Sequence, residues 1–323
     1  MITKEMLLKD MIIHKEQGYA LYCYYNGNEI MDCSGKLGDS LSDDITFDSN
    51  FRLASVSKQF IAFAIVNLIN QGDITFDTKI TSIFNQLPCY FNDITIKHLL
   101  NHTSGIYDYE DMEHDENIQI VDEDIIDFLL TTDKTYFEPG STYRYSNTGY
   151  ILLGLIVSKV TNRALNEYIE TDIFKKALMF NSKANIHGKT IIDKRAYGHI
   201  IDEFNNLIVK DQYWCSATIG DGGLYSSIND LKKWVKYLVS TENFELMKEA
   251  NYIKENDYNE YGLGLRNVNV CGKELIYHTG STIGTNTLLL FSIDFNLCVL
   301  FLTNINNNST TKIKDRLVEY FNK

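Results

Sequence analysis

Hydrophobic positions recur with two different periods along this chain, which divides it into a strand-rich start, a helical middle and a strand-rich end. After a first helix predicted within 1–14, strand-like apolar runs at 19–25 and 28–33 flank Asn26-Gly27. Asn-Gly between two such runs is a strong signal for a tight β-hairpin. Strand-like runs return late in the chain, at 274–278, 286–292 and 297–303.

The middle of the chain has the helical period. Residues 55–71 are apolar nearly all round, which predicts a helix that is buried on every side and ends at Gly72. Another helix is expected at 94–100, with Thr95 as its N-cap. Further helices follow from the same period, at 148–159, at 226–238 and over the closing residues Ile313, Leu317, Val318 and Phe321.

Strands at both ends with helices between them predict an α+β fold. We expect an antiparallel β-sheet flanked by the terminal helices, with a mostly helical region inserted. A chain of 323 residues has room for one large domain or two intertwined parts. We predict a single domain over 1–323, made of an α/β part (about 1–72 and 241–323) and a mostly helical part (about 73–240).

Composition is that of a soluble globular protein, with 44% hydrophobic and 23% charged residues. The formal net charge of −13 disfavours nucleic acids and anionic membrane surfaces as partners. No apolar run approaches the roughly 18 residues that a membrane-spanning helix needs. The N-terminal residues lack the apolar core and cleavage site of a signal peptide, so a cytoplasmic location is expected. The alternative is an exported protein that has lost its leader.

Acidic residues concentrate in 108–116, and no Lys or Arg occurs from His98 to Asp133. The first interpretation is a solvated surface loop. The second is a charged rim beside a binding site, which would repel anionic substrates.

The cysteines and histidines do not form a metal-binding pattern. None of the six cysteines stands in a CxxC pair, and they lie singly in mostly apolar or aromatic runs, as buried free thiols do. Cys23 and Cys33 can approach across the hairpin, but this spacing does not establish a disulfide. The seven histidines show neither HxH nor HExxH spacing, so we expect no metal and no cofactor.

The candidate chemistry centres on Ser55 and Lys58 at the start of the buried helix. Residues three positions apart on a helix share one face, so the amine can take the serine proton and leave an oxygen nucleophile. The helix N-terminus favours negative charge on that oxygen, and apolar surroundings help a lysine to lose its proton. A serine that only caps a helix explains the same spacing, so the pair needs further support.

Tyr145-Ser146-Asn147 supplies the first such support. Tyr145 is a second candidate proton carrier, because a nearby cation such as Lys58 makes a phenol a better base. Asn147 offers a donor and an acceptor that can orient the lysine and bind a substrate carbonyl. Taken alone, the segment also fits a capped helix entry.

His278-Thr279-Gly280 follows a predicted strand near the end of the chain. Gly280 leaves space for a substrate against the strand edge, and the backbone N–H of Ser281 would join that of Ser55 in an oxyanion hole. His278 would hold the Tyr145 proton or meet a substrate carboxylate. Taken alone, this segment fits a strand that ends in a turn. The predicted substrate-binding residues are Asn147, His278, Thr279, Gly280 and Ser281.

The three segments, in this order, resemble the three-part signature of the serine β-lactamase and penicillin-binding protein superfamily. The likeness is strongest to its class C β-lactamase and D-Ala-D-Ala carboxypeptidase-like branch, which has esterase-like members. It spans about residues 17–305, with further matching segments at 51–60, 99–105, 137–154, 222–231 and 261–264.

This resemblance implies a serine hydrolase that acts through a covalent acyl-enzyme on small amides, esters or D-amino-acid peptides. Ser55 would attack the carbonyl, Lys58 and Tyr145 would move the proton, and water would resolve the ester. Short peptides or small molecules are the expected substrates, with β-lactams as acylating ligands. Many family members carry Lys where this chain has His278, and a neutral histidine suits a carboxylate less well, which weakens the expectation of β-lactamase activity.

The alternative is a protein that binds β-lactams or peptidoglycan fragments and is acylated without efficient turnover. The intact set of Ser55, Lys58 and Tyr145 argues against an inactive scaffold. An α/β-hydrolase elbow is excluded because Gly280-Ser-Thr-Ile-Gly284 has Thr at its centre, and Gly220-Asp-Gly-Gly223 lacks the lysine of a phosphate-binding loop.

Overall fold

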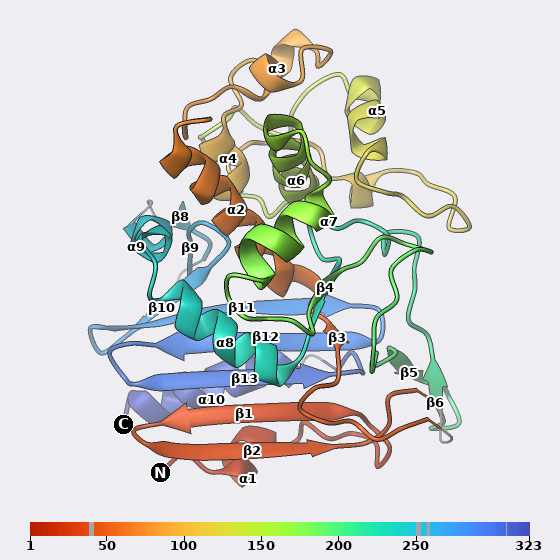
Figure 1. The fold of residues 1–323 in the computed structure, drawn as a ribbon, viewed down its shortest axis with the longest axis vertical. Coiled ribbons are helices and arrows are strands. Elements are labelled where there is room, and N and C mark those ends of the chain that lie inside the picture. The colour runs from red at the N-terminus through yellow and green to blue at the C-terminus, as the bar shows by residue number, and fades with distance from the viewer. Residues whose placement is uncertain (39–41, 250–252, 257–258, 308) are drawn as a thin grey trace.

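The computed structural model describes residues 1–38, 42–249, 253–256, 259–307 and 309–323. Within them, an eight-stranded antiparallel sheet forms the base of the molecule in Figure 1. In sheet order its strands are β2 (Asn28–Ser34), β1 (Tyr19–Tyr25), β13 (Leu297–Thr303), β12 (Thr285–Ser292), β11 (Lys273–Thr282), β10 (Arg266–Val270), β9 (Glu260–Tyr261) and β8 (Ile253–Lys254).

The predicted hairpin joins β1 to β2. Tyr25 pairs with Asn28, and both turn residues have a positive φ, 48° at Asn26 and 86° at Gly27. This is the turn geometry that Asn-Gly favours, because its twist matches that of the strands. β1 also pairs with β13, so the first and last strands of the chain lie side by side (Figure 1).

The terminal helices α1 (Lys4–Leu8) and α10 (Ser309–Phe321) pack on one face of this sheet, as predicted. Leu7, Ile313 and Leu317 are fully buried there against the sheet. The first helix is shorter than expected, because Lys9 leaves the helical region with ψ at 125°. The other face of the sheet packs against the helical part of the molecule, with α8 lying across it (Figure 1).

Helices lie above the sheet and across one of its faces (Figure 1), which confirms the α+β class. They are α2 (Lys58–Gln71), α3 (Ile80–Ile83), α4 (Ile96–Leu100), α5 (Asp124–Thr131), α6 (Asn147–Thr161), α7 (Leu165–Tyr168), α8 (Ile228–Leu238) and α9 (Glu242–Glu249). Short 3₁₀ and π segments add to them: η1 (Ala54–Ser57), η2 (Cys89–Phe91), η3 (Tyr109–Asp111) and the π-helical η4 (Ile169–Phe174). Thr95 caps α4 as predicted, and the division into an α/β and a helical part stays a prediction.

The described residues also form two small sheets, whose strands lie in the region predicted to be mostly helical except for Phe51–Arg52, which belongs to the predicted α/β part. One orders its strands β3 (Phe51–Arg52), β7 (Leu224–Ser226) and β4 (Lys183–Ala184), and the other pairs β5 (His199–Ile201) with β6 (Leu207–Val209). The small sheet at β3 connects the entry of the buried helix to the segment just after Gly222 and Gly223.

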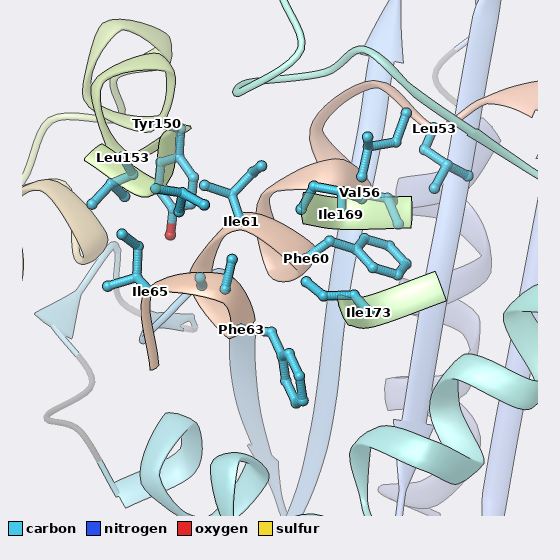
Figure 2. Close-up of a cluster of buried hydrophobic side chains, with 14 of the residues drawn as sticks. Leu53, Val56, Phe60, Ile61, Phe63, Ile65, Tyr150, Leu153, Ile169 and Ile173 are labelled. Carbon is cyan, nitrogen blue, oxygen red and sulfur yellow. The ribbon is translucent and has the colours of Figure 1, made fainter. Parts of the chain in front are cut away.

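α2 runs through the centre of the core. Figure 2 shows its apolar side chains between Tyr150 and Leu153 of α6 and Ile169 and Ile173 of η4. The ring of Phe60 also stacks on Trp234 of α8, with 4.2 Å between ring centroids. Each such fully buried side chain contributes about 1.5–3 kcal/mol, so the helix is fixed firmly. Gly72 ends it in the left-handed conformation (φ 81°), as predicted.

All six cysteines are free thiols. The hairpin register places Cys23 opposite Ile30 and Cys33 opposite Ala20, so the two cysteines are not paired across it. Over the described part of the chain, every helix is too short or too polar to cross a membrane.

Candidate active site

Ser55 lies in a tight turn rather than in the helix itself. The predicted helix 55–71 begins with the 3₁₀ turn η1, and its α-helical part starts at Lys58. Ala54 has a φ of 47°, the left-handed conformation that costs an ordinary residue about 1–2 kcal/mol. The surrounding structure therefore imposes this backbone shape, which leaves Ser55 half-buried while its neighbours Ala54 and Val56 are buried.

Gly280 of β11 is one cause of that constraint. A Cβ atom on Gly280 would lie 2.1 Å from the carbonyl oxygen of Leu53 and 3.1 Å from the Cβ of Ala54. Thr287 of the next strand holds the same carbonyl, because its Oγ1 donates a hydrogen bond of 2.7 Å to it. The sequence predicted that a substrate would lie in the space at Gly280. In the structure, the backbone before Ser55 occupies that space.

Lys58 connects Ser55 to two other segments. The lysine is fully buried, and its Nζ donates to Ser55 Oγ at 3.2 Å, to Asn147 Oδ1 at 2.7 Å and to the carbonyl oxygen of Asp221 at 2.8 Å. The three hydrogens of an ammonium thus match three acceptors. The structure brings together Ser55, Lys58 and Asn147, and it adds Asp221.

Tyr145 lies at the same centre with its ring half-buried. Lys58 Nζ is 5.0 Å from the ring centroid and the guanidinium carbon of Arg266 is 5.3 Å from it. Both side chains lie within the distance of a cation–π contact with this ring. The imidazole of His102 packs on the ring as well, with centroids 4.3 Å apart.

The N-terminus of α6 fixes the position of Asn147. Ser146 caps the helix by accepting a hydrogen bond from the Gly149 N–H at 3.1 Å. The buried carboxylate of Asp108 accepts from the N–H groups of Asn147 at 2.6 Å and Thr148 at 3.3 Å. A carboxylate at a helix N-terminus satisfies donors that the helix leaves free.

His278 lies behind the site rather than at its surface. It is fully buried, with Nε2 at 3.0 Å from the hydroxyl of Tyr261 and Nδ1 at 2.7 Å from the carbonyl of Thr279. Because a carbonyl only accepts, Nδ1 carries the proton and Nε2 accepts from the tyrosine. Burial and the nearby charges of Arg266 and Lys58 hold the pKa of His278 well below its usual value, so the ring is neutral.

The strand residues after His278 form an open edge. β10 pairs with β11 only as far as Arg266 opposite Tyr277, so the next residues of β11 have a strand partner, β12, on one side alone. Thr279 is half-buried and Ser281 is exposed along this edge. Ser281 also accepts a hydrogen bond from Asn306 at 3.2 Å.

Different parts of the acidic segment 108–116 fit the two interpretations of the sequence, a solvated loop and a charged rim beside the site. Its later residues, from Glu113 to Glu116, are exposed, as in a solvated loop. Glu110 is exposed as a residue, but protein surrounds its carboxyl group, and this burial with the carboxylates of Asp221 and Asp108 raises its pKa to about 7. Although acids gather here, the described residues contain no group of three side chains arranged to hold a metal ion.

The sequence analysis did not name Asp221, Tyr261 or Arg266 as site residues, and it treated Asp108 and Glu110 only as part of the acidic segment 108–116. Most of them act through contacts between distant segments, such as the hydrogen bond that the Asp221 carbonyl accepts. No pattern of residues in the sequence predicts such contacts. The sequence contained only an indirect indication of Asp221 and Tyr261: the segments 222–231 and 261–264, which resemble the family, begin next to Asp221 and at Tyr261.

Comparison with known proteins places this chain in a family. A family model described as Beta-lactamase matches residues 6–321. Penicillin-binding protein 4* of Bacillus subtilis (strain 168) is 30% identical over 280 residues, which cover 80% of this chain and 61% of that protein. Protein flp of Staphylococcus aureus (strain MW2) is 24% identical and is covered over 55% of its length. The chain thus spans about three fifths of the length of the curated relatives it matches.

Solved structures share the fold at lower identity. A penicillin binding protein from Bacillus halodurans superposes with a TM-score of 0.83 at 24% identity, covering 99% of this chain and 100% of that one. D-amino acid amidase from Ochrobactrum anthropi SV3, complexed with L-phenylalanine, gives 0.80 at 22% identity, with 97% and 94% covered. The family model covers nearly the whole sequence, so the chain belongs to the Beta-lactamase family.

Proposed function

We propose that this protein is a serine hydrolase that forms a covalent acyl-enzyme on Ser55. The observation that carries this proposal is the 3.2 Å contact between Lys58 Nζ and Ser55 Oγ. When Lys58 is neutral, its two N–H groups would still donate to Asn147 Oδ1 and to the carbonyl oxygen of Asp221, and its lone pair would point at Ser55. A proton moved from Ser55 to Lys58 then restores the fully bonded ammonium as the oxygen attacks the carbonyl.

Tyr145 is proposed as the second proton carrier. Its ring lies beside Arg266 and beside Lys58, which becomes an ammonium once it has taken the Ser55 proton. The tyrosine can pass a proton to the leaving group and later take one from the water that resolves the ester.

The substrate is proposed to lie along the open edge of β11. A peptide-like chain can add to such an edge through main-chain hydrogen bonds. The backbone N–H groups of Ser55 and Ser281 would hold the oxyanion, and Asn147 would contact a substrate carbonyl. Thr279 and Ser281 reach this edge, and Gly280 and His278 support it from behind.

We infer that the substrates are small amides, esters or D-amino-acid peptides, with β-lactams as acylating ligands. Above about pH 7, where its carboxyl group is ionised, Glu110 near Lys58 and Asn147 disfavours anionic groups, and the neutral, buried His278 offers no charge to a carboxylate. One protein with the same fold is a D-amino acid amidase, and one relative in sequence is a penicillin-binding protein, which supports both ligand classes.

Steady-state kinetics on a panel of substrates test this proposal. The panel holds an activated short ester, a D-amino-acid amide, its L-enantiomer and a penicillin, each with wild type and with Ser55→Ala. Turnover of the ester and D-amide that disappears in Ser55→Ala supports the hydrolase. A single-equivalent burst without turnover supports the alternative, a binding protein that is acylated but not recycled. Turnover that survives in Ser55→Ala contradicts both.

A further inference from the structure

A tight loop carries one of the carbonyl groups that bind Lys58. In this loop, residues 218–223, a Cβ atom on Gly223 would lie 2.4 Å from the carbonyl oxygen of Thr218, so the backbone folds closely back on itself. The carbonyl of Asp221 lies within the loop and accepts a hydrogen bond of 2.8 Å from Lys58 Nζ. The position of the loop therefore sets the position of an acceptor on which the proposed base depends.

Asp122, which lies 97 residues before Ile219 in the chain, holds this loop through two backbone N–H groups. Its Oδ2 accepts from the N–H of Ile219 at 2.7 Å, and its Oδ1 accepts from the N–H of Gly220 at 2.8 Å. Hydrogen bonds from successive backbone N–H groups to a charged carboxylate are short and strong. Because Gly220 directly precedes Asp221, the carboxylate fixes the backbone one residue before the carbonyl that Lys58 uses.

Other contacts of the loop hold different atoms. The hydroxyl of Tyr109 donates to the side-chain carboxylate of Asp221 at 3.1 Å. Arg52 donates through Nε to the carbonyl of Gly222, the residue after Asp221, at 3.2 Å. Asp122 and Arg52 thus hold the backbone on the two sides of the Asp221 carbonyl, and Asp122 provides the hold on the earlier side.

The carboxyl group of Asp122 is deeply buried, with only 6% of the residue exposed. Burial raises its pKa to about 7; the two N–H donors oppose this rise, and the carboxylates of Asp221 and Glu123 add to it. Asp122 also lines a cavity of about 550 Å³, where the other charged or titratable residues in the described part of the chain are Glu123, His187 and Lys189, all exposed. The two N–H groups of the loop are therefore the main stabilisation of the Asp122 charge.

The protonation state of Asp122 decides how firmly the loop is held. An ionised carboxylate offers an acceptor to each of the two N–H groups. A protonated carboxyl group carries an O–H donor on one oxygen, so one of the two contacts loses its acceptor. Because this pKa is about 7, the double contact is complete above about pH 7 and weakens below it.

We propose that Asp122 is a positioning residue for the reaction: its carboxylate holds the loop 218–223 in the place from which the Asp221 carbonyl binds Lys58. This inference rests on the proposed function of the site and deepens it, since it names a residue outside the site that regulates the proposed base. When Asp122 is protonated, the loop loosens, the Asp221 carbonyl shifts, and Lys58 is no longer held in line with Ser55.

Asp122→Asn tests this role through the pH dependence of activity. Asparagine has the shape of a protonated aspartic acid and keeps its donor and its acceptor at every pH. On a short activated ester, kcat of wild type should exceed that of Asp122→Asn about 10-fold at about pH 8.5 and by less than about two-fold at about pH 5.5, with KM within about two-fold. Dividing one profile by the other removes the pH dependence that the two proteins share. A role in stability alone would leave kcat of the folded protein unchanged at every pH.

Glu123→Gln is the control, because it removes the same charge at an exposed residue one position away. Its kcat should stay within about two-fold of wild type at both pH values.

Wild type alone provides a second test, which does not require the variant to fold. Labelling isoleucine carbonyl carbons with ¹³C and glycine nitrogens with ¹⁵N selects the two Ile-Gly peptide groups of the chain, at Gly220 and Gly284. In nuclear magnetic resonance spectra, the Gly220 amide signal should move with a midpoint near pH 7, and it should stay in place in Asp122→Asn.

The outcomes separate this inference from the proposed function. A ratio of kcat values that is the same at both pH values, in a wild type that hydrolyses the ester, overturns the role of Asp122 and leaves the hydrolase intact. Two amide signals that do not move across this pH range overturn it whatever the turnover. A signal that moves in a wild type without ester turnover overturns the proposed function and, with it, the positioning role.

Discussion

Gly280→Ala is the most direct test of how β11 positions the nucleophile. The added Cβ would lie 2.1 Å from the Leu53 carbonyl oxygen and 2.3 Å from Thr287 Oγ1, where ordinary Cβ contacts do not fall below 3.0 Å. The first contact involves backbone, so no flexible side chain can yield. The turn that carries Ser55 and the strand must therefore separate by about 0.9 Å to raise that contact from 2.1 to 3.0 Å.

Two magnitudes follow from this displacement. Overpacking of a tight contact destabilises a protein by about 1–3 kcal/mol. A misplacement of about 1 Å at a reacting group lowers its rate by on the order of 100-fold. Gly280→Ala should therefore reduce kcat for a short activated ester about 100-fold and lower the free energy of unfolding by about 1–3 kcal/mol.

Ester kinetics and urea denaturation measure the two effects. Gly149→Ala is the matched control, because a Cβ there would meet no atom closer than 3.7 Å and the residue lies within α6. This control should gain up to about 1 kcal/mol of stability, since alanine favours a helix over glycine. Wild-type kcat in a folded Gly280→Ala protein would refute the reasoning, because it would mean that the nucleophile turn does not depend on this approach.

Three further predictions concern the charges of the site. Lys58→Met should lower kcat by at least about 100-fold, measured on the same ester, because the proposed base is lost; activity near wild type would rule that base out. Burial lowers the pKa of His278. The contribution of this histidine to stability is therefore present above about pH 6.5 and is lost as the pH falls, because the unfolded chain binds a proton at a higher pH than the folded protein does. In urea denaturation, the decrease in unfolding free energy caused by His278→Gln should thus be smaller at about pH 5.5 than at about pH 7.5. An equal decrease at both pH values would contradict a buried neutral ring. Glu110→Gln should raise kcat/KM for a carboxylated ester relative to a neutral one by up to about 10-fold at about pH 8.5, where this carboxyl, with its pKa of about 7, is ionised; an unchanged ratio there would mean that the charge of Glu110 does not select substrates.

Local residue patterns predicted the main elements of the fold. Asn26-Gly27 specified the hairpin, Gly72 ended α2, and the apolar run after Lys58 identified the central helix, because each depends on neighbours in sequence. The short strands β3, β4 and β7 were missed because two or three residues are too few to show alternation. The 3₁₀ turn at Ser55 was also missed, since it is imposed by β11 and not by its own residues.

For the site, the sequence identified the residue types but not their directions. It placed Ser55, Lys58 and Asn147 in one group, and the structure joins them through Lys58 Nζ. It could not show that His278 turns inward to Tyr261, because strand residues can face either side of a sheet and burial depends on distant segments. The role of the Asp221 carbonyl could not be predicted for a related reason, since every residue carries a backbone carbonyl.

The measurement that tests the central claim most directly is the intact mass of the protein after brief exposure to an activated ester and to a penicillin, followed by peptide mapping. Our account predicts one acyl group per chain on the peptide that contains Ser55, short-lived for the ester, absent from Ser55→Ala and retained in Ser57→Ala, whose serine lies in the same turn. Label on another residue, or a stable fold that gains no mass with either probe, would contradict it.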